Sequence, residues 1–299
     1  VEQAQLFSNN SRSKYIILKN KYKKNEFIRP AGSDFKKGDK IVKKGQLINS
    51  KHILAFKTLG IEKVLVKKKP KLVFYPTGNE LSENKKIPNW KIRNSNTSYL
   101  KNYIKNLPVN FEVKKILRDN QSVNFKKEII KNMNSRSDIV ITSGAVSAGK
   151  FDFIPKIIKK FKIKKMFKGV AIRPGKPIMF VKFKNNKVFF GLPGNPISSA
   201  ACFRFFIIPF LLNSLQMQKE KPIIAKLDNS FIKKKKFTRF IKGVINRTNK
   251  GLTKFKVLKG QESFKINSFT RSNSWGLFPS GRSYFEKGYL IKCYTNSPF

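Results

Sequence analysis

Apolar and polar positions alternate with two different periods between residues 69 and 218. Short apolar runs of strand length lie at 72–75, 111–117, 138–142, 167–172, 178–183 and 187–192. Longer segments with helical spacing separate them, at 96–105, 122–132, 154–160 and 196–215. Strands that alternate with helices of this length are typical of a mostly parallel sheet covered by helices on both faces. This region therefore predicts an α/β fold, with Asn185-Asn186 as a hairpin turn between its last two strands.

The two flanking regions follow other patterns. Residues 1–68 hold a β-like run at 15–18, several turns and one helix over 51–59 with Ser50 as its cap, which predicts a small mixed module. This module begins abruptly, so we expect it to be the incomplete end of something longer. After a linker at 219–222 the pattern is all strand, which predicts a small β-barrel. The predicted domains are a partial N-terminal module (1–68), an α/β domain (69–218) and a C-terminal β-barrel (219–299).

Charge changes this picture less than its size suggests. The chain carries 65 Lys and Arg against 16 Asp and Glu, a formal net charge of +49. Such a charge favours polyanions at low salt. However, Lys, Asn, Ile and Phe are abundant together, as A/T-rich codons would produce, and the basic residues are spread along the whole chain. We therefore expect no specific nucleic-acid partner, and the Lys233–Lys236 run is expected to be a solvated turn.

The remaining composition concerns the compartment. Cys202 and Cys293 lie far apart without metal-ligand spacing, which predicts buried free thiols in a reducing compartment and hence a cytoplasmic protein. The apolar run 203–212 is too short for a bilayer, so we expect no membrane association. His52 is the single histidine, which excludes a histidine-based metal cluster and a serine–histidine triad, and we expect it on a helix surface.

Candidate chemistry gathers where the predicted parallel strands end, because ligands of such sheets bind beyond the carboxyl ends of the strands. The strand 138–142 leads into a small-residue loop that contains Ser143, Gly144, Ser147 and Gly149 and ends at Asp152. Such a loop presents backbone N–H groups to an anion, and a carboxylate beside it can hold a hard cation. The other polar groups that follow strands are Glu80, Asp119, Arg173, Lys176 and Asn195.

Each acidic residue could also have a purely structural role, as a helix cap or in a lone salt bridge. We favour that role for Asp138, which precedes its strand, and a functional role for Glu80 and Asp152, each of which follows a glycine-containing loop. The two readings of Asp119 are balanced. Arg173 and Lys176 flank Pro174-Gly175, and two cations on a rigid turn suit a phosphate or another oxyanion.

Several motifs resemble those of one family, the molybdopterin molybdenumtransferases, which include MoeA and the gephyrin E domain. Pro76-Thr-Gly-Asn-Glu-Leu81 resembles the family's Ser-Thr-Gly-Asp-Glu-Leu, and Thr142–Asp152 resembles Thr-Gly-Gly-Val-Ser-Val-Gly-x-x-Asp. Arg173-Pro-Gly-Lys-Pro177 resembles Lys-Pro-Gly-Lys-Pro. Gly191–Ser198 is similar to Gly-Leu-Pro-Gly-Asn-Pro-Val-Ser. Arg29–Asp34 and Ser272–Leu277 are similar to further family segments, so the resemblance runs along the whole chain.

The resemblance implies an activity and a set of roles. The activity is Mg²⁺-dependent insertion of molybdate into adenylyl-molybdopterin with release of AMP. The implied catalytic residues are Glu80, Asp119 and Asp152, and the implied metal ligands are Asp152, Glu80 and Asp34. The implied substrate-binding residues are Thr77, Gly78, Ser143, Gly144, Ser147, Gly149, Arg173, Lys176, Pro193, Gly194, Asn195, Pro196 and Ser198.

The resemblance also implies partners and leaves alternatives. Family members act as homodimers, and a molybdopterin adenylyltransferase is an implied partner. The family's Asn-Ser-Ala-Met-Asp-Gly-Tyr-Ala motif has no counterpart here, so we expect a chain shortened at its N-terminal side. An adenylyltransferase-like enzyme and a non-catalytic scaffold or binding protein of the same fold remain alternatives. The predicted barrel argues against the first, because simple adenylyltransferases consist of one domain.

Overall fold

The computed structural model describes residues 4–6, 16–18, 21–118, 122–134, 137–145 and 154–297. The chain divides into two compact units, residues 1–62 and 63–299. In the first unit, β1 (Ala4–Leu6) pairs antiparallel with β2 (Ile16–Leu18), and α1 spans Ser50–Thr58. His52 lies on α1 but is only 5% exposed, so the prediction of a surface histidine is wrong. Its Nδ1 accepts a hydrogen bond from the Asn49 backbone N–H at 3.1 Å, which ties down the start of the helix.

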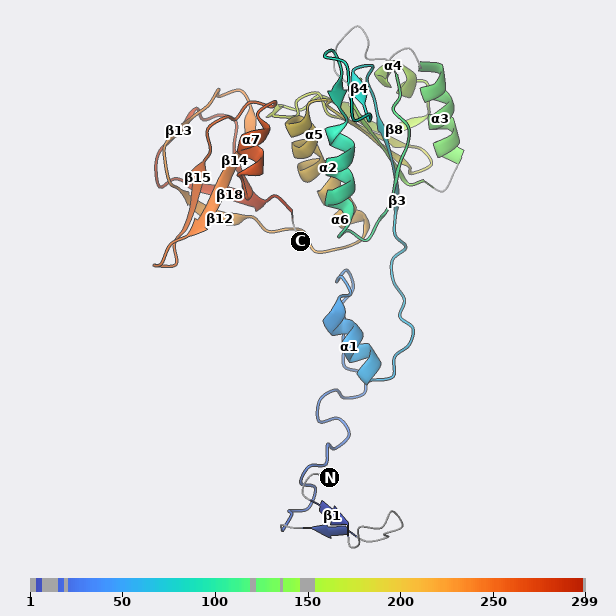
Figure 1. Cartoon of the computed structure of the whole chain (residues 1–299), viewed down its shortest axis with the longest axis vertical. Coiled ribbons are helices and arrows are strands. Elements are labelled where there is room, and N and C mark those ends of the chain that lie inside the picture. The colour runs from blue at the N-terminus through green and yellow to red at the C-terminus, as the bar shows by residue number, and fades with distance from the viewer. Residues whose placement is uncertain are drawn as a thin grey trace. The chain divides into compact units, whose positions relative to one another are not determined.

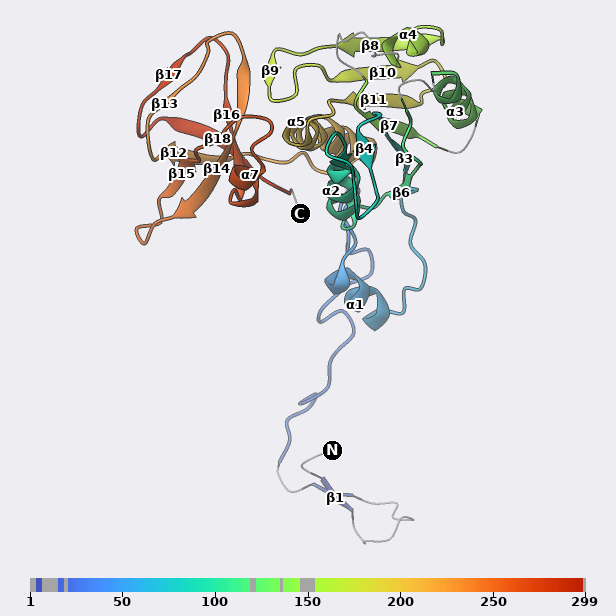
Figure 2. The same ribbon diagram turned by 45° about the horizontal axis from the view of Figure 1, so that its top comes forward.

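The second unit contains the predicted α/β sheet. Its strand order is β6-β3-β7-β11-β10-β8, with the strands stacked side by side in Figure 2. The strands are β3 (Lys71–Pro76), β6 (Asn110–Val113), β7 (Ile139–Ser143), β8 (Ile163–Lys168), β10 (Met179–Phe183) and β11 (Val188–Leu192). Four neighbours, β6, β3, β7 and β11, are parallel. β10 runs antiparallel between β11 and β8, which confirms the hairpin at Asn185-Asn186.

Strand periodicity divides the apolar side chains between two cores. In β3, Leu72 and Phe74 face α2 (Ser95–Ile104), α5 (Pro196–Cys202) and α6 (Ile208–Ser214). Val73 and Tyr75 face α3 (Ser122–Asn134) and α4 (Ile154–Ile158). Each such side chain contributes about 1.5–3 kcal/mol when it is fully buried. Helices therefore cover both faces of the sheet, and the predicted fold class is confirmed.

One long helical run forms most of the first core. It consists of α5, a π-helical turn η1 (Phe203–Ile207) and α6. The apolar run 203–212 predicts a segment too short for a bilayer, whereas the complete run Pro196–Ser214 is long and apolar enough to cross a membrane by length and composition alone. However, 67% of that run is buried inside the fold, as is usual for the core helix of a globular protein.

The C-terminal strands close into a five-stranded barrel (Figure 1). The strands are β12 (Ile223–Leu227), β14 (Thr238–Arg247), β15 (Thr253–Val257), β16 (Ser274–Phe278) and β18 (Leu290–Thr295). β15 closes the barrel by pairing with both β12 and β14. The Phe255 ring fills its interior, because Gly243 and Gly276 leave room: a Cβ on Gly243 would lie 2.2 Å from that ring. The short elements β13 (Phe231–Ile232), β17 (Tyr284–Phe285) and α7 (Ile266–Thr270) complete this region.

The barrel and the α/β region meet at an interface, where β9 (Ile172–Arg173) pairs in parallel with the start of β14. We call this interface the seam. Figure 2 shows β9 between the sheet and the barrel. The single strand predicted over 167–172 is wrong, because Gly169, with φ +79°, separates β8 from β9. Across the seam, Phe205 of η1 stacks on Phe240 of β14 with ring centroids 3.9 Å apart. The division into three domains stays a prediction.

Burial also corrects two local predictions. The Lys233–Lys236 run is not simply a solvated turn: Lys233 is 5% exposed, and its Nζ donates to the Phe237 carbonyl at 3.0 Å. Cys202 and Cys293 are both free and buried, as predicted. Burial raises the pKa of both thiols, so neither is a reactive thiolate at neutral pH.

Candidate functional site

Three loops meet at the carboxyl edge of the parallel strands. The Thr77 backbone N–H and side-chain hydroxyl both donate to the Ser143 carbonyl, at 3.0 and 2.8 Å. The Gly144 N–H donates to the Leu192 carbonyl at 2.9 Å. These bonds join the ends of β3, β7 and β11, which carry three of the four sequence motifs. The strand-end rule therefore correctly predicts that these motifs lie together.

The loops approach each other too closely for a side chain at Gly144. This residue has φ +98°, and a Cβ on it would lie 2.6 Å from the Thr77 carbonyl oxygen. A Cβ on Gly194 would lie 3.7 Å from the Gly144 Cα, so the third loop passes beside the first two. Glycine at position 144 lets its backbone pack directly against the Thr77 backbone.

Hydrogen bonds from the Arg118 side chain fix the loop that follows β3. Its Nη1 donates to the carbonyls of Gly78, Asn79 and Leu81, at 3.2, 3.0 and 2.9 Å. Gly78 has φ +137°, and the Glu80 carboxylate folds back over it, because a Cβ on Gly78 would lie 2.4 Å from Glu80 Oε2. Glu80 itself is exposed at the surface of the loop. A carboxylate is thus presented on a fixed loop at the edge where an anion would bind.

The loop before α5 is also held in place, and it lies among unpaired hydroxyls. Asn96 of α2 donates to the Gly194 carbonyl at 2.8 Å. Asn94 caps α2 by accepting from the Thr97 N–H. The buried hydroxyls of Thr142, Ser143 and Ser199 have no hydrogen-bond partner within the described part of the chain. Unpaired buried hydroxyls at one edge are suited to a polar ligand.

The Arg173–Pro177 loop is contacted by Cys202 of α5 and by Phe237 of the barrel region. Gly175, with φ +105°, lies on the buried Cys202 thiol, which donates to its carbonyl at 3.5 Å. From the barrel, the Phe237 ring contacts both cations, with Arg173 Cζ at 4.5 Å and Lys176 Nζ at 6.0 Å from the ring centroid. Cation–π contacts hold these side chains without neutralising them.

Arg239 adds a third cation to this part of the seam. Burial lowers its pKa, the positive charge of Arg173 lowers it further, and Glu262 opposes both effects. Its Nε is buried without a hydrogen-bond partner among the described residues. Neither Arg173 nor Lys176 has a carboxylate ion-pair partner in the part of the chain that the structure describes. We name Arg173, Lys176 and Arg239 the seam cations.

The predicted site residues fall into three groups. The described edge brings together Thr77, Gly78, Glu80, Ser143, Gly144, Pro193, Gly194, Asn195, Pro196 and Ser198, with Arg173 and Lys176 on the loop at the seam. Asp119, Ser147, Gly149 and Asp152 lie outside the described residues. Asp34 is an exposed residue of the first unit. Within the described ranges, no group of three or more His, Cys, Asp or Glu side chains could hold a metal ion.

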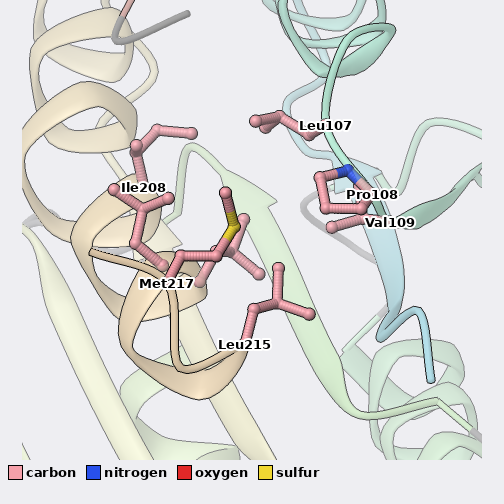
Figure 3. A pocket seen from close by; sticks show the side chains of 8 residues that line it. Leu107, Pro108, Val109, Ile208, Leu215 and Met217 are labelled. Atoms are coloured by element: carbon pink, nitrogen blue, oxygen red, sulfur yellow. The ribbon is translucent and has the colours of Figure 1, made fainter. Parts of the chain in front are cut away.

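Two pockets among the described residues lie elsewhere. One is a wholly apolar recess between the turn before β6 and the end of α6 (Figure 3), lined by Leu107, Pro108, Val109, Ile208, Leu211, Leu212, Leu215 and Met217. Another is lined partly by Asp138 and Ile139, at the start of β7. Asp138 accepts a hydrogen bond from the Lys71 N–H at 2.7 Å, which fits its predicted structural role. Both recesses lie at the amino ends of the parallel strands, away from the motif loops.

Comparisons with known proteins identify the family. A family model described as "Probable molybdopterin binding domain" matches residues 74–213. The molybdopterin molybdenumtransferase of Staphylococcus aureus strain Mu50 is 33% identical over 280 residues, which cover 92% of this chain and 66% of that protein. The enzyme of the same name from Staphylococcus epidermidis strain RP62A is 32% identical over the same shares. The chain belongs to the molybdopterin molybdenumtransferase family.

A solved structure supports this membership over both regions of the second unit. The molybdopterin biosynthesis MoeA protein from Pyrococcus horikoshii superposes with a TM-score of 0.72 and 27% identity, covering 89% of this chain and 64% of that one. The chain thus spans about two thirds of the length of the molybdenumtransferases that it matches. The family places it in molybdenum cofactor biosynthesis, with a transferase role among its relatives.

Four residues near the site were not predicted from the sequence. Arg118 and Asn96 hold two of the motif loops, and Phe237 and Arg239 reach the Arg173–Pro177 loop from the barrel. The sequence could have indicated Arg118, because it directly follows the predicted strand 111–117. In the structure, Leu117 at the end of that stretch forms an isolated parallel bridge with Thr77. Phe237 and Arg239 had no such signal, because β9 must pair with β14 before they meet the loop.

Proposed function

We propose that the chain carries the substrate site of a molybdopterin molybdenumtransferase, which inserts molybdate into adenylyl-molybdopterin and releases AMP. The observation that carries the proposal is the convergence of the Thr77, Gly144 and Gly194 loops at one sheet edge, where Gly144 lies too close to the Thr77 carbonyl for a side chain. Small-residue loops that follow strands can present backbone N–H groups to a phosphate. The buried hydroxyl of Ser143, on the second motif, and that of Ser199, directly after the fourth, have no partner among the described residues and would complete polar contacts to the substrate.

We assign the diphosphate end of the substrate to this edge, with Glu80 beside it. Glu80 is a fixed, exposed carboxylate, and carboxylate oxygen is the donor that Mg²⁺ prefers. Glu80 and Asp152 would hold the metal, with Asp119 as a further catalytic acid. Bound Mg²⁺ would supply charge neutralisation of the phosphates. The protein's own contribution is to fix the loop through Arg118 and to bring the Gly144 backbone close to the Thr77 carbonyl.

We assign the molybdate end to the seam cations. Molybdate is a tetrahedral dianion, and several fixed cations with no ion-paired carboxylate suit it. Arg173 and Lys176 are fixed by the Phe237 ring, and Arg239 carries an unpaired Nε–H in the same region. This arrangement supports the transferase over an adenylyltransferase-like enzyme of one domain, because the barrel itself provides Phe237 and Arg239.

The larger assembly follows from the same proposal. We propose a homodimeric, cytoplasmic protein that receives its adenylylated substrate from a molybdopterin adenylyltransferase. The Asp34 carboxylate would act in that assembly as an additional acidic group of the site.

The test is AMP release from adenylyl-molybdopterin in the presence of molybdate and Mg²⁺. We expect Glu80→Gln and Asp152→Asn to abolish release while circular dichroism stays unchanged. Magnesium titration by calorimetry gives a second readout, because both variants should lose metal binding even without substrate. Unchanged turnover in both variants would remove the metal assignment, and a folded wild-type chain without turnover would favour the scaffold alternative.

The molybdate assignment has its own test. We expect Lys176→Ala to weaken molybdate binding in equilibrium dialysis about tenfold, the loss of one charge-assisted contact. Lys184→Ala is the matched control, because it removes one charge from the exposed hairpin between β10 and β11. Equal losses in both variants would mean that molybdate responds only to net charge.

A further inference from the structure

The two tryptophans of the chain differ sharply in burial. The chain has two tryptophans. Trp275 is 1% exposed and belongs to the core at the seam, whereas Trp90 is 65% exposed. Single exposed apolar residues are common and need no explanation in themselves. The position and the fixation of Trp90 are what distinguish it.

Trp90 lies next to the first motif loop. The short strand β4 (Leu81–Ser82) pairs in parallel with β5 (Ile92–Arg93), and the Ile92 N–H donates to the Glu80 carbonyl at 2.8 Å. Trp90 is two residues before Ile92, in the turn that the Lys91 N–H closes on the Pro88 carbonyl, so its backbone lies within about 7 Å of Ile92.

The segment that carries Trp90 is fixed by a series of hydrogen bonds. Arg93 Nη1 donates to the carbonyls of Asn84 and Lys85, at 3.3 and 3.0 Å. The Lys91 N–H donates to the Pro88 carbonyl at 2.9 Å, and the Asn94 N–H donates to the Ser82 carbonyl at 3.1 Å. A ring that is exposed but held in place can bind a partner without a large ordering cost.

The surroundings of the ring are cationic. Lys91 Nζ lies 4.8 Å from the centroid of the Trp90 ring, and Lys85 and Lys86 are exposed on the same segment. With Lys91 over one face and 65% of the residue exposed, the indole keeps surface for a second aromatic ring. An aromatic platform beside cations is the combination that binds a nucleobase and its phosphate.

We propose that Trp90 is a stacking platform for the adenine ring of an adenylate whose phosphate lies at the motif loops. The inference rests on the proposed function and adds to it a residue that selects the nucleotide half of the substrate. Adenine is favoured over a protein partner because the segment that carries Trp90 is hydrogen-bonded to the Glu80 backbone and carries exposed lysines that suit a phosphate.

The experiment measures binding of AMP, without the pterin, to the whole chain. Because Trp275 is buried, quenching of tryptophan fluorescence by a stacked base reports on Trp90. We expect saturable quenching by AMP and none by ribose 5-phosphate. In equilibrium dialysis, Trp90→Leu should weaken AMP binding about fivefold or more, and Trp90→Phe, which keeps a ring, should stay within about twofold. Tyr284→Leu is the matched control, because Tyr284 is a 51% exposed aromatic residue of the barrel.

Three results would overturn the inference. The first is equal AMP affinity in Trp90→Leu and wild type. The second is quenching by 6-hydroxymethylpterin and not by AMP, which would assign the platform to the pterin. The third is an equal loss in Tyr284→Leu. In each case, AMP release that depends on Glu80 would leave the proposed function intact. Conversely, AMP stacking on Trp90 without any AMP release would retain this inference and reject the transferase.

Discussion

The guanidinium of Arg173 lies 4.5 Å from the centroid of the Phe237 ring, so a residue of the barrel supports a loop of the α/β region. Lys176 approaches the same ring at 6.0 Å. The two cations repel each other and must be held near one another for an anion to meet both. The Phe237 ring attracts both through its face, and β9 keeps it in register by pairing with β14.

Replacing Phe237 with leucine should therefore weaken anion binding more than folding. Leucine keeps most of the apolar volume but has no aromatic face, so the two cations lose about 0.5–1 kcal/mol of support. We expect molybdate affinity, measured by equilibrium dialysis, to fall about two- to fivefold. Phe231→Leu is the control, because Phe231 packs on Phe278 inside the barrel and contacts neither cation. The same loss in that variant would mean that general loosening of the barrel explains the effect.

A buried ion pair across the seam gives a prediction about stability. Arg204 is 1% exposed, donates to the Glu220 carboxylate and, through Nε, to the Thr295 carbonyl at 3.0 Å. Glu220→Gln leaves the guanidinium buried beside a neutral partner, which should cost about 3 kcal/mol in the free energy of unfolding. Urea denaturation followed by circular dichroism measures this cost.

The exposed pair Arg282–Glu286 is the matched control. Its side chains are 44% and 64% exposed and 3.9 Å apart, so Glu286→Gln should cost less than about 1 kcal/mol. If the two variants lose similar amounts, the seam pair is not an important support of the barrel.

The sequence predicts the central strands β3, β7 and β11 well because they are buried on both faces. Leu72, Val73, Phe74 and Tyr75 are apolar without interruption, and helical segments separate such runs, so little besides a covered parallel sheet fits. The meeting of the Thr77 and Gly144 loops follows from the same rule, because parallel strands end at one edge. These parts of the site depend only on local pattern and topology.

Other parts depend on contacts between distant segments. β9 forms because Thr238 pairs with Ile172, and nothing near residue 172 indicates this. Lys233 is buried because the Phe237 carbonyl accepts from its Nζ and the Phe285 ring lies beside it, which requires a closed barrel. A lysine run without that context resembles a solvated turn. Arg118 meets three carbonyls only after the Gly78 loop has folded.

The contact between Gly175 and Cys202 allows a separation of steric and conformational effects. Gly175→Ala combines an unfavourable φ of +105° with a Cβ only 2.5 Å from Cys202 Sγ. Gly281→Ala has φ +86° and nothing within 4 Å, so it measures the backbone cost alone, about 1 kcal/mol.

We expect Gly175→Ala to cost more than Gly281→Ala in urea denaturation, and Cys202→Ala to recover the difference in the double variant. The coupling between positions 175 and 202 should be about 1 kcal/mol or more. Additive effects of the two substitutions would show that the loop can move away from the thiol.

Lys242 should make the stability of the chain depend on pH in an unusual direction. It is 1% exposed, and its Nζ donates to the carbonyls of Glu262 and Lys265, at 3.2 and 3.0 Å. Burial lowers the pKa of Lys242 to about 8; Glu262 raises it and Arg239 lowers it by smaller amounts. In the unfolded chain a lysine keeps its proton to about pH 10.4.

Below about pH 8 both states carry the proton at Lys242, so this residue adds no pH dependence. Between about pH 8 and pH 10.4 the unfolded chain binds a proton that the folded chain has lost, so stability must rise with pH. We expect the difference in unfolding free energy between wild type and Lys242→Met to be flat below pH 8 and to increase in favour of wild type above it.

Taking the difference between the two proteins cancels the titration of the buried tyrosines and thiols, which they share. Lys292→Met is the matched control, because Lys292 is an exposed lysine of β18 in the same barrel. A difference that stays constant from pH 7 to pH 10 would show that the Lys242 ammonium is as well solvated in the fold as in water, and its two carbonyl contacts would then offset its burial completely.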